Sequence, residues 1–540
     1  MELPAELTGP AAAELTIPAV VARGAGEFGE AEALADPGPG GARLSYRELG
    51  TRVAAVAGAL IDGGLRPGDR VAVWAPNTCE WVLAALGALS AGGVLVPVST
   101  RFTGPEALDV IGRSGARVLF VASDFLGADR LGALRAAAAA SGGGLNWLDR
   151  LARVVRMPDE WAEFERGGSA VALERAGAER AGAERAAMVA ERAAAVRPGD
   201  VSDIMFTSGT TGRSKGAMTS HERTLGVARA WARCAGLTAR DRYLVVNPFF
   251  HTFGYKAGIL ACLVSGAALV PLAVFDAGEA LRLIEAERIT VLPGAPALYV
   301  SLLDHPARGS CDLSSLRLAV TGAADVPAAL VERMRRELSF DEVLTAYGLT
   351  EAVVATMCRP GDPAGLVAAT SGRAAAGFEV RIGPGEEILL RGPNLMLGYL
   401  DDPAATAAAI DGDGWLHTGD AGRLNEAGYL AITGRIKDMY ICGGFNVYPA
   451  EVEQVLARLD GVAESAVIGV PDPRLGEVGR AFLVPRPGHA LAEADVLAFC
   501  RERLAGYKVP RQVVFRDALP RNASGKVLKR QLRAEPREES

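Results

Sequence analysis

The sequence predicts an α/β protein with a large N-terminal part and a small α+β domain at the C-terminal end. Short apolar runs typical of buried strands alternate with helical patterns over much of the chain. Two long uncharged stretches, 81–100 and 257–275, each combine an Ala/Leu-rich helix, a glycine break and a short Val/Leu strand, which is the pattern of a buried unit in a parallel sheet. After Tyr347 the pattern changes to short strands separated by Gly/Pro turns.

The length of the chain bears on the number of domains. A chain of 540 residues is too long for one hydrophobic core, so two or more domains are expected. The likeness of the two uncharged stretches predicts two related doubly wound α/β subdomains, and the short strands beyond Tyr347 predict a distorted β-barrel beside them. We therefore expect an N-terminal domain at 1–436 and a small lid domain at 437–540.

Local patterns predict the individual elements. Residues up to Ala42 are rich in Ala, Gly and Pro and predict one helix and a surface loop. Ser45 as N-cap, with Glu48 as its capping-box partner, predicts a helix that opens at 44–49. The other expected elements are a helix at 277–287, buried strands at 71–75, 94–98, 118–121, 243–246, 268–272, 290–292 and 318–320, and antiparallel strands at 380–382, 387–390 and 429–432.

A repeated Glu-Arg-Ala-Gly-Ala sequence occupies residues 174–186. Its five-residue period matches the amphipathicity of neither a helix nor a strand. Arg180 and Glu184 have the spacing of a helical ion pair, but the glycines weaken a helix. We expect 174–197 to form a solvated, low-complexity surface insertion without a function.

Charge and cysteine content bear on the class of protein. A net charge of −7 does not indicate an electrostatic footprint for nucleic acid. The seven cysteines are scattered and suit free thiols in a reducing cytosol, and the five histidines lack the spacing of zinc ligands. The N-terminus shows no secretory pattern, and glycine interrupts both uncharged stretches. We expect a cytoplasmic protein without a transmembrane segment, whereas the oligomeric state is open.

The stretch 204–218 predicts a phosphate-binding loop. An apolar run ends a buried strand, and hydroxyl side chains, three glycines and one lysine follow it. Glycine lets backbone N–H groups approach a ligand closely, and lysine adds a positive charge, so the stretch suits phosphate oxygens. The spacing differs from that of a Walker A loop, and an ordinary Gly/Ser/Thr loop is the alternative. The expected phosphate-binding residues are Thr207, Ser208, Gly209, Thr210, Thr211, Gly212 and Lys215.

Two stretches in the second half suit an acid and a purine. Residues 247–255 place four aromatic rings and His251 on a turn that begins with proline. A core cluster and the wall of an acyl pocket, with His251 beside the carboxylate, are both compatible with this pattern. Gly322, Ala323 and Ala324 follow an expected strand, and their small side chains would let a flat purine lie against the backbone.

The string 346–352 places the Glu351 carboxylate beside the Thr350 hydroxyl at the end of an expected strand. Magnesium prefers oxygen ligands and keeps several waters, so one carboxylate together with nucleotide phosphates is enough to bind it. A surface turn is the alternative. Tyr347, Gly348, Thr350 and Glu351 are therefore candidate nucleotide-binding residues, with Glu351 as the candidate metal ligand.

Two acidic and basic strings follow. The string 414–420 ends in Asp420, whose carboxylate can accept hydrogen bonds from two vicinal ribose hydroxyls. Arg435, in the string 434–438, can reach ribose or phosphate. A pair of solvated turns is the alternative for both strings.

The C-terminal part contributes a glycine pair and a lysine. Gly443 and Gly444, followed by Phe445, allow a narrow groove beside the backbone. Cys442 has no histidine nearby in the sequence, so we interpret it as a buried thiol. Lys526 lies on a glycine-containing turn, where it becomes functional only if the small domain folds over the large one.

Taken in this order, the strings resemble the motifs of the acyl-adenylate-forming superfamily, which comprises acyl-CoA synthetases, adenylation domains and luciferases. The motifs run from Ile204 to Lys526, and a looser likeness extends back to about Leu44. The resemblance implies a two-step ligase that uses ATP, Mg²⁺ and CoA. A carboxylate attacks the α-phosphate of ATP, which gives acyl-AMP and pyrophosphate, and the thiol of CoA then attacks the acyl carbon.

The resemblance also implies a role for each matched residue. The loop 207–215 would hold the β- and γ-phosphates, and Lys526 would bridge the carboxylate and the α-phosphate in the first step. Lys437 matches the hinge, where rotation would withdraw Lys526 and bring the glycine pair up to form a pantetheine tunnel. The remaining matched residues would bind phosphate and magnesium (Thr350 and Glu351) and ribose (Asp420 and Arg435).

Within the superfamily, the chain is similar to actinobacterial CoA ligases that act late in steroid-ring degradation, on the propanoate left on the oxidised hydrindane remnant. This resemblance implies a wide pocket near His251, with Tyr255 or Lys256 as donors to the ring ketones. The alternatives are a medium-chain fatty acid or aryl acid CoA ligase, or a stand-alone adenylation enzyme that loads a carrier protein. The similar stretches are 247–268, 303–332, 345–360 and 435–487.

Overall fold

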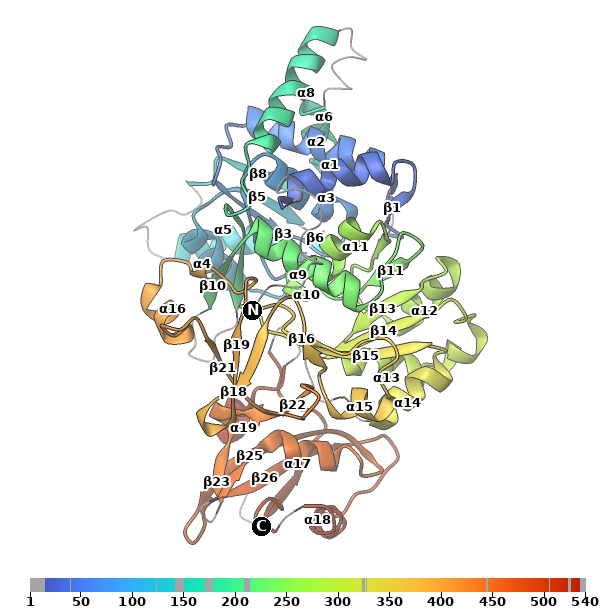
Figure 1. Cartoon of the computed structure of the whole chain (residues 1–540), viewed down its shortest axis with the longest axis vertical. Helices are drawn as coiled ribbons and strands as arrows, with labels where there is room; N and C mark the ends of the chain where they lie inside the picture. Colours follow the sequence, from blue (N-terminus) through green and yellow to red (C-terminus); the bar gives the residue numbers. More distant parts are fainter. Residues whose placement is uncertain are drawn as a thin grey trace.

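The chain folds into a large N-terminal body and a smaller C-terminal domain, which begins near β23 (Tyr440–Cys442) and lies below the body in Figure 1. A sheet of antiparallel strands lies between the two parts. The structure is a computed structural model, and it describes residues 15–38, 40–122, 124–140, 150–169, 178–207, 214–322, 326, 328–442, 445–504, 506–522 and 526–534.

The first sheet contains the α/β units expected in the first half of the chain. Its parallel strands have the order β9-β4-β3-β5-β8, and β10 and β20 extend it with antiparallel strands at one edge. Beside the sheet, α2 (Tyr46–Asp62) begins with the expected capping box of Ser45 and Glu48. The strands are β3 (Arg70–Trp74), β4 (Val94–Pro97), β5 (Ala116–Ala122), β8 (Arg153–Met157), β9 (Val201–Thr207), β10 (Lys215–Ser220) and β20 (Gly398–Tyr399).

The second sheet has the order β17-β16-β15-β14-β13-β11-β12-β1-β2, with a parallel core from β15 to β12. Together with the first sheet it confirms two doubly wound α/β subdomains. The strands are β1 (Glu32–Ala35), β2 (Arg43–Ser45), β11 (Arg242–Val245), β12 (Ala268–Pro271), β13 (Val291–Gly294), β14 (Leu318–Gly322), β15 (Glu342–Tyr347), β16 (Thr356–Met357) and β17 (Arg373–Ala374).

The N-terminal segment differs from the expectation of one helix and a surface loop. The helix is α1 (Ile17–Glu27), but β1 then joins the second sheet, where Leu34 pairs with Leu269 in parallel. Leu34 is buried, so the apolar residues of this segment contribute to the core instead of a loop. The chain therefore uses its first strand to tie the N-terminal subdomain to the neighbouring sheet.

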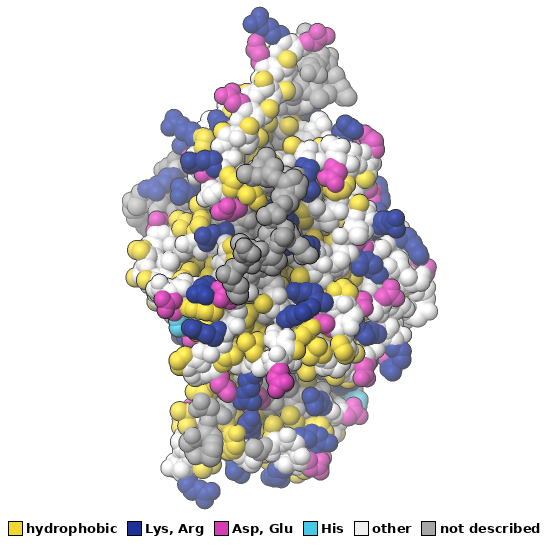
Figure 2. All heavy atoms as spheres, viewed as in Figure 1, with side chains coloured by type: hydrophobic (Ala, Val, Ile, Leu, Met, Phe, Trp, Pro, Cys, Tyr) yellow, Lys and Arg dark blue, Asp and Glu magenta, His cyan; other side chains and the backbone are white. Residues whose placement is uncertain are grey.

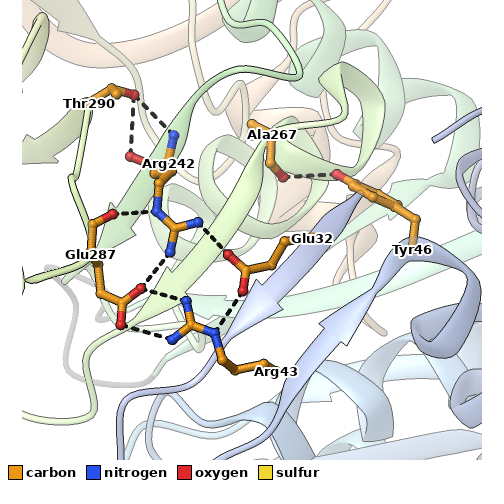
Figure 3. A network of polar contacts seen from close by, with 7 residues as sticks. All are labelled: Glu32, Arg43, Tyr46, Arg242, Ala267, Glu287 and Thr290. Atoms are coloured by element: carbon orange, nitrogen blue, oxygen red, sulfur yellow. Dashed lines mark hydrogen bonds and ion pairs between the residues drawn. The ribbon is translucent and has the colours of Figure 1, made fainter. Parts of the chain in front are cut away.

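A network of charged side chains holds this junction (Figure 3). The Arg43 guanidinium contacts Glu32 at 2.9 Å and Glu287 at 2.8 Å, and Arg242 contacts the same two carboxylates. The hydrogen bond from Arg43 lowers the pKa of Glu287, although burial opposes the shift. Next to it, the Tyr46 hydroxyl donates to the backbone oxygen of Ala267 at 2.9 Å. The network links β2, β11 and the end of α12.

The antiparallel sheet β18-β19-β21-β22 confirms the expected distorted barrel strands and packs between the other parts. In the C-terminal domain, β25 and β26 form a long antiparallel pair that β23, β24 and β27 extend, over a hydrophobic core of its own. The strands are β18 (Glu379–Ile382), β19 (Glu387–Arg391), β21 (Leu416–Leu424), β22 (Leu430–Arg435), β24 (Phe445–Val447), β25 (Val462–Asp472), β26 (Gly476–Pro485) and β27 (Gln512–Phe515).

The helices cover the faces of the sheets, and both uncharged stretches contain the expected helix-to-strand unit. The remaining helices are α3 (Cys79–Ser90), α4 (Gly104–Ser114), α5 (Arg130–Ala140), α6 (Trp161–Gly167), α8 (Glu179–Ala194), α9 (His221–Cys234), α10 (Thr252–Gly254), the π-helix η4 (Tyr255–Ile259), α11 (Leu260–Ser265), α12 (Ala277–Ala286), α13 (Pro296–Asp304), α14 (Ala328–Glu337), α15 (Ala364–Ala369), α16 (Pro403–Ala409), α17 (Pro449–Leu456), α18 (Glu493–Arg501) and α19 (Lys529–Arg533).

The repeat segment is more ordered than expected, because α8 is a regular helix that packs on the body. Arg180 and Glu184 form the helical ion pair at 2.8 Å, while Arg192 donates to the backbone oxygen of Leu65 at 3.1 Å. Val189, which belongs to α8, has a buried side chain. Apart from Gly182 and Val189, the residues of α8 are exposed or half-buried, so the segment lies at the surface but is anchored to the body. The anchoring contacts join distant parts of the chain, which a local repeat does not reveal.

The cysteines, the hydrophobicity of the helices and the surface charge bear on the class of protein. All seven cysteines are free thiols, as the sequence predicts. In the part of the chain that the structure describes, none of the helices combines the length and apolar character needed to cross a bilayer. Figure 2 shows basic and acidic side chains mixed over the visible face, including the C-terminal domain.

A buried ion pair lies behind the expected phosphate loop. The Lys256 ammonium contacts the Asp203 carboxylate at 2.8 Å, and both side chains are fully buried. Asp203 also accepts hydrogen bonds from the hydroxyls of Ser202 at 2.7 Å and Thr224 at 2.9 Å. Asp203 lies on β9 and Lys256 on η4, so the pair fixes the strand before the loop against the helix that follows His251.

We predict that Lys256→Met destabilises the protein by about 3–5 kcal/mol, because it leaves the Asp203 carboxylate buried without its cation. Asp203→Asn combined with Lys256→Met should recover much of this loss, since neither charge remains. Urea unfolding followed by tryptophan fluorescence measures both effects.

The matched control is Arg282→Met, which breaks the exposed contact of Arg282 with Glu279 at 2.6 Å. We expect little change from it, because solvent screens an exposed pair. A Lys256→Met protein as stable as this control would contradict the prediction.

Candidate active site

The two ends of the expected phosphate loop are held together as a hairpin. Thr207 ends β9 and lies opposite Lys215, which begins β10, and the Thr207 hydroxyl donates to the Lys215 backbone oxygen at 3.4 Å. Gly216 follows on β10, where the Leu400 N–H donates to its backbone oxygen at 2.8 Å. Ser208, Gly209, Thr210, Thr211 and Gly212 lie outside the described residues.

A compact turn presents Glu351 at the end of β15. A side chain at Gly348 would place its Cβ 1.7 Å from the backbone oxygen of Val353, so only glycine fits the close approach of the two segments. The Val353 N–H donates to Leu349 at 2.5 Å and closes the turn. Val353 itself has a φ of 60°, a strained conformation for a β-branched residue. The turn thus fixes the segment that carries Thr350 and Glu351.

Tyr399 joins the two charged groups at the phosphate end of the site. Its hydroxyl donates to Glu351 Oε1 at 2.6 Å, and the Lys215 ammonium lies 5.0 Å from its ring centroid. Burial and the neighbouring carboxylate raise the pKa of Tyr399, so the hydroxyl stays protonated and donates. No local motif in the sequence marks Tyr399, because its hydrogen bond to Glu351 spans 48 positions and Lys215 is still more distant in the chain.

Asp420 and Arg435 lie opposite each other on β21 and β22. Arg435 Nε contacts Asp420 Oδ1 at 3.2 Å, and the Tyr347 hydroxyl donates to Asp420 Oδ2 at 2.7 Å. Burial and the Asp420 carboxylate raise the pKa of Tyr347, so its hydroxyl also remains a donor. The structure therefore joins Tyr347, Asp420 and Arg435 in one cluster.

Lys526 of the C-terminal domain interacts electrostatically with this cluster. Loss of surrounding water and repulsion by Arg435 lower the pKa of Lys526 to about 8, against the attraction of Asp420 and Asp438. Its backbone N–H donates to Asn522 Oδ1 at 2.8 Å, which shapes the turn. The residue as a whole remains exposed.

Contacts between the two parts of the chain accompany this interaction. Helix α17 packs against β22, and the hydroxyl of Tyr448, just before α17, donates to the backbone oxygen of Gly385 at 3.4 Å. Gly434 on β22 leaves room for Tyr448, because an added Cβ would lie 3.0 Å from the tyrosine Cβ. Lys437, the expected hinge, lies in the short helix η7 (Ile436–Asp438) directly after β22.

The aromatic stretch 247–255 divides between core and surface. Phe249 and Tyr255 are buried against Trp81, with ring centroids 5.2 Å and 6.1 Å from it. His251 is exposed, and its Nδ1 accepts from the Phe253 N–H at 3.2 Å. Nearby protein atoms lower the pKa of His251 by desolvation, although the residue as a whole is exposed.

The expectation that Lys256 donates to a ketone of the acid is wrong, whereas the role expected of Tyr255 stays a prediction, because its buried hydroxyl has no hydrogen-bond partner among the described residues. Tyr255 and Lys256 are fully buried, and the Lys256 ammonium is held by Asp203 at 2.8 Å. Both residues belong to the π-helical turn η4, which directs their side chains into the core between η4, α3 and β9. Of the other residues assigned to the acyl pocket, His251 is exposed and Gly322 is half-buried.

The purine stretch and the glycine pair are described only in part. Gly322 ends β14, and a Cβ there would lie 2.4 Å from the backbone oxygen of Ala346, so β14 and β15 approach closely at this point. Phe445 begins β24. Cys442 is buried, which raises the pKa of its thiol and agrees with a structural cysteine. Ala323, Ala324, Gly443 and Gly444 lie outside the described residues.

The chain matches two protein-family models. Residues 21–400 match the AMP-binding enzyme family, and residues 451–526 match the AMP-binding enzyme C-terminal domain. Two curated proteins share its sequence over nearly their whole length. Both are named 3-[(3aS,4S,7aS)-7a-methyl-1,5-dioxo-octahydro-1H-inden-4-yl]propanoyl:CoA ligase, one from Rhodococcus jostii and one from Mycobacterium tuberculosis. The Rhodococcus protein is 57% identical, and the match covers 96% of this chain and 98% of that protein. The Mycobacterium protein is 60% identical, and the match covers 91% of this chain and 94% of that protein.

Solved structures show the same fold. An anthranilate CoA ligase in complex with anthranoyl-AMP superposes with a TM-score of 0.83 at 25% identity, covering 96% of both chains. A fatty acyl CoA synthetase of Mycobacterium tuberculosis gives a TM-score of 0.73 at 30% identity, covering 97% of this chain and 98% of its own. A feruloyl-CoA synthase of an Amycolatopsis species is a more distant relative in sequence, 37% identical over 92% of this chain and 94% of its own.

We predict that Lys526 titrates near pH 8, well below an ordinary lysine at about 10.4. Amine-acylating reagents react with the neutral amine, so the labelling rate of Lys526, followed by mass spectrometry across pH, should reach half its plateau near pH 8. Arg435→Gln should move this midpoint upward, because one repelling charge is removed. Arg423→Gln, which removes an exposed arginine paired with Glu386 at 3.1 Å, should leave it unchanged. A midpoint at or above pH 10 would contradict the prediction.

Proposed function

The chain belongs to the AMP-binding enzyme family, and from this premise we propose that it is an ATP-dependent acid–CoA ligase for a hydrindane propanoate of steroid-ring degradation. The observation that carries the proposal is the cluster of Tyr347, Asp420 and Arg435 on the body, with which Lys526 of the C-terminal domain interacts electrostatically. An isolated binding fold does not need a lysine brought from a second domain. The identity of about three in five residues with ligases of the named acid supports the substrate.

In the proposed reaction, the acid first attacks the α-phosphate of ATP. The β- and γ-phosphates would lie against the loop 207–215, where Lys215 supplies positive charge. Thr350 would donate its hydroxyl to phosphate. The donor set fits magnesium, because Glu351 offers a carboxylate and the phosphates offer further oxygens. Magnesium bound there would neutralise phosphate charge, and Glu351 would hold it.

The ribose and the adenine have separate positions. Asp420 would accept from the ribose hydroxyls, and the hydrogen bond from Tyr347 at 2.7 Å keeps the Asp420 carboxylate oriented. Arg435 would contact ribose or phosphate from the opposite strand. The purine would lie against 322–324, where β14 and β15 end side by side.

Lys526 is the group that we assign to the first chemical step. The acid and the α-phosphate both carry negative charge, and the transition state crowds these oxygens together. An ammonium between them stabilises that arrangement more than it stabilises either reactant alone. Because the pKa of Lys526 is lowered to about 8, the ammonium is mainly protonated at pH 7, and this half-reaction should weaken as pH rises above 8.

In the second step the thiol of CoA would attack the acyl carbon of the adenylate, the bond between the acyl carbon and the phosphate oxygen would break, and AMP would leave as the thioester forms. We propose domains at 1–436 and 437–540, with Lys437 as the hinge between them. Rotation there would withdraw Lys526 and place Gly443, Gly444 and Phe445 beside the pantetheine arm. A domain movement of this kind lets one site perform two reactions in order.

The acid would lie between the 247–255 segment and the end of β14. His251, neutral and accessible, would lie beside its carboxylate. Phe249 and Tyr255 support this wall from the core, against Trp81. An aryl acid is the second candidate, since a 37% identical relative is a feruloyl-CoA synthase.

We predict that Lys526→Ala lowers the adenylation rate by about 10²-fold or more and spares thioester formation from purified acyl-AMP and CoA. Pyrophosphate exchange measures the first half-reaction and thioester chromatography the second. Arg521→Ala is the control, because Arg521 lies on the same turn, paired with Glu464 at 2.8 Å. Equal loss in both half-reactions would refute the role assigned to Lys526.

We predict that the bicyclic diketo propanoate is the best substrate in a panel that includes octanoate, benzoate and ferulate. A rigid ring system loses little conformational entropy on binding, and several apolar contacts together should favour it by about 10-fold or more in kcat/KM. CoA-thioester formation measured for each acid tests this. A higher kcat/KM for ferulate or octanoate would replace the steroid-derived acid and leave the ligase activity intact.

A further inference from the structure

We propose that Tyr399 is a positioning residue that keeps Lys215 and Glu351 apart and ready for magnesium-bound ATP. The inference rests on the proposed function, because it concerns the phosphate end of the same site. Its basis is one side chain that engages both charged groups at once, through its hydroxyl and through its ring.

Opposite charges near one another tend to pair directly. A direct contact between the Lys215 ammonium and the Glu351 carboxylate would neutralise both groups that the phosphates and magnesium need. In the described residues, Glu351 Oε1 accepts the Tyr399 hydroxyl at 2.6 Å and the Lys215 ammonium lies over the Tyr399 ring, 5.0 Å from its centroid. The ring therefore separates the two charges while stabilising each of them.

The two contacts differ in how easily a ligand replaces them. A cation over a ring keeps its own hydrogen-bond donors, so Lys215 can turn to a phosphate at low cost. The hydroxyl contacts Oε1 of Glu351, and a carboxylate accepts several hydrogen bonds or a metal ion in addition. Tyr399 can thus stay in place when the ligand binds, which is what a positioning residue requires.

The backbone holds Tyr399 firmly in this place. Strand β20 pairs with β10, so that Tyr399 lies opposite Ala217, two residues after Lys215. The Tyr399 N–H donates to the Thr406 hydroxyl at 2.9 Å, which anchors β20 to α16. On the other side, the Met396 N–H donates to the backbone oxygen of Glu351 at 2.8 Å. The segment 396–399 therefore bridges both of the elements that carry the two charged groups.

The test uses variants that remove one contact or both. Tyr399→Phe keeps the ring under Lys215 and loses the hydrogen bond to Glu351, whereas Tyr399→Leu loses both. The matched control is Tyr429→Phe, since the Tyr429 hydroxyl donates to Asp362 at 2.8 Å and its ring lies 6.0 Å from the Arg373 guanidinium, away from the site. Thermal unfolding of each variant shows that it is folded.

Three quantities are measured: the magnesium concentration that half-saturates pyrophosphate exchange, the equilibrium binding of magnesium-bound ATP without acid, and thioester formation from purified acyl-AMP. We expect Tyr399→Phe to raise the half-saturating magnesium concentration and weaken ATP binding about 10-fold, the cost of one hydrogen bond to a charged group. Tyr399→Leu should have a larger effect. Thioester formation should be unchanged in both, because its substrates lack the β- and γ-phosphates.

A double variant tests the separation of charges. If Tyr399→Leu lets Lys215 pair with Glu351, adding Lys215→Met frees the carboxylate and should lower the half-saturating magnesium concentration again. The positioning role is refuted if Tyr399→Phe and Tyr399→Leu match Tyr429→Phe in magnesium requirement and ATP binding, or if both half-reactions fall equally. Failure of the proposed function has another signature, since the unmodified protein would then show no acid-dependent pyrophosphate exchange.

Discussion

A site for phosphate must keep positive charge available while carboxylates lie close by, and the structure meets this demand in three ways. The Lys215 ammonium rests on the ring of Tyr399. Arg435 contacts Asp420 at 3.2 Å but keeps 44% of its side chain exposed, so much of the guanidinium can still bind a ligand. Lys526 is held where desolvation and repulsion from Arg435 lower its pKa to about 8. In none of these three arrangements is the cation held in a buried ion pair. A ligand could displace such a pair only at a high cost in free energy.

Behind the site, by contrast, a lysine is held in a fully buried ion pair. Lys256 and Asp203 are both fully buried, and their contact at 2.8 Å is supported by two hydroxyls. Such a pair is expensive to separate, which suits a fixed support and not a ligand-binding group. On the proposed function, the difference in burial between Lys256 and Lys215 would distinguish a structural lysine from a phosphate-binding one.

Sequence reasoning predicted the parts of the fold and of the site that depend on contiguous residues. The helix opened by Ser45 and the alternation that leads to the two parallel sheets are local signals. Tyr399 could not be found in this way. Its interest lies in its contacts with Glu351 and Lys215, which are distant in the sequence, and a tyrosine does not by itself indicate a particular reaction or ligand. The assignment of Lys256 failed for a related reason: the sequence does not reveal that the π-helical turn η4 directs this side chain to Asp203 on β9.

The orientation of the C-terminal domain has an electrostatic consequence for the order of the two steps. While ATP is bound, its phosphates would offset the mutual repulsion of Lys526 and Arg435. Once pyrophosphate leaves, this repulsion is opposed mainly by Asp420 and Asp438, while α17 and Tyr448 still pack against the body at β22 and Gly385. On the proposed function, the product of the first step thus weakens the attraction that held Lys526 in place. The charges that assist adenylation also favour the rotation that must follow it.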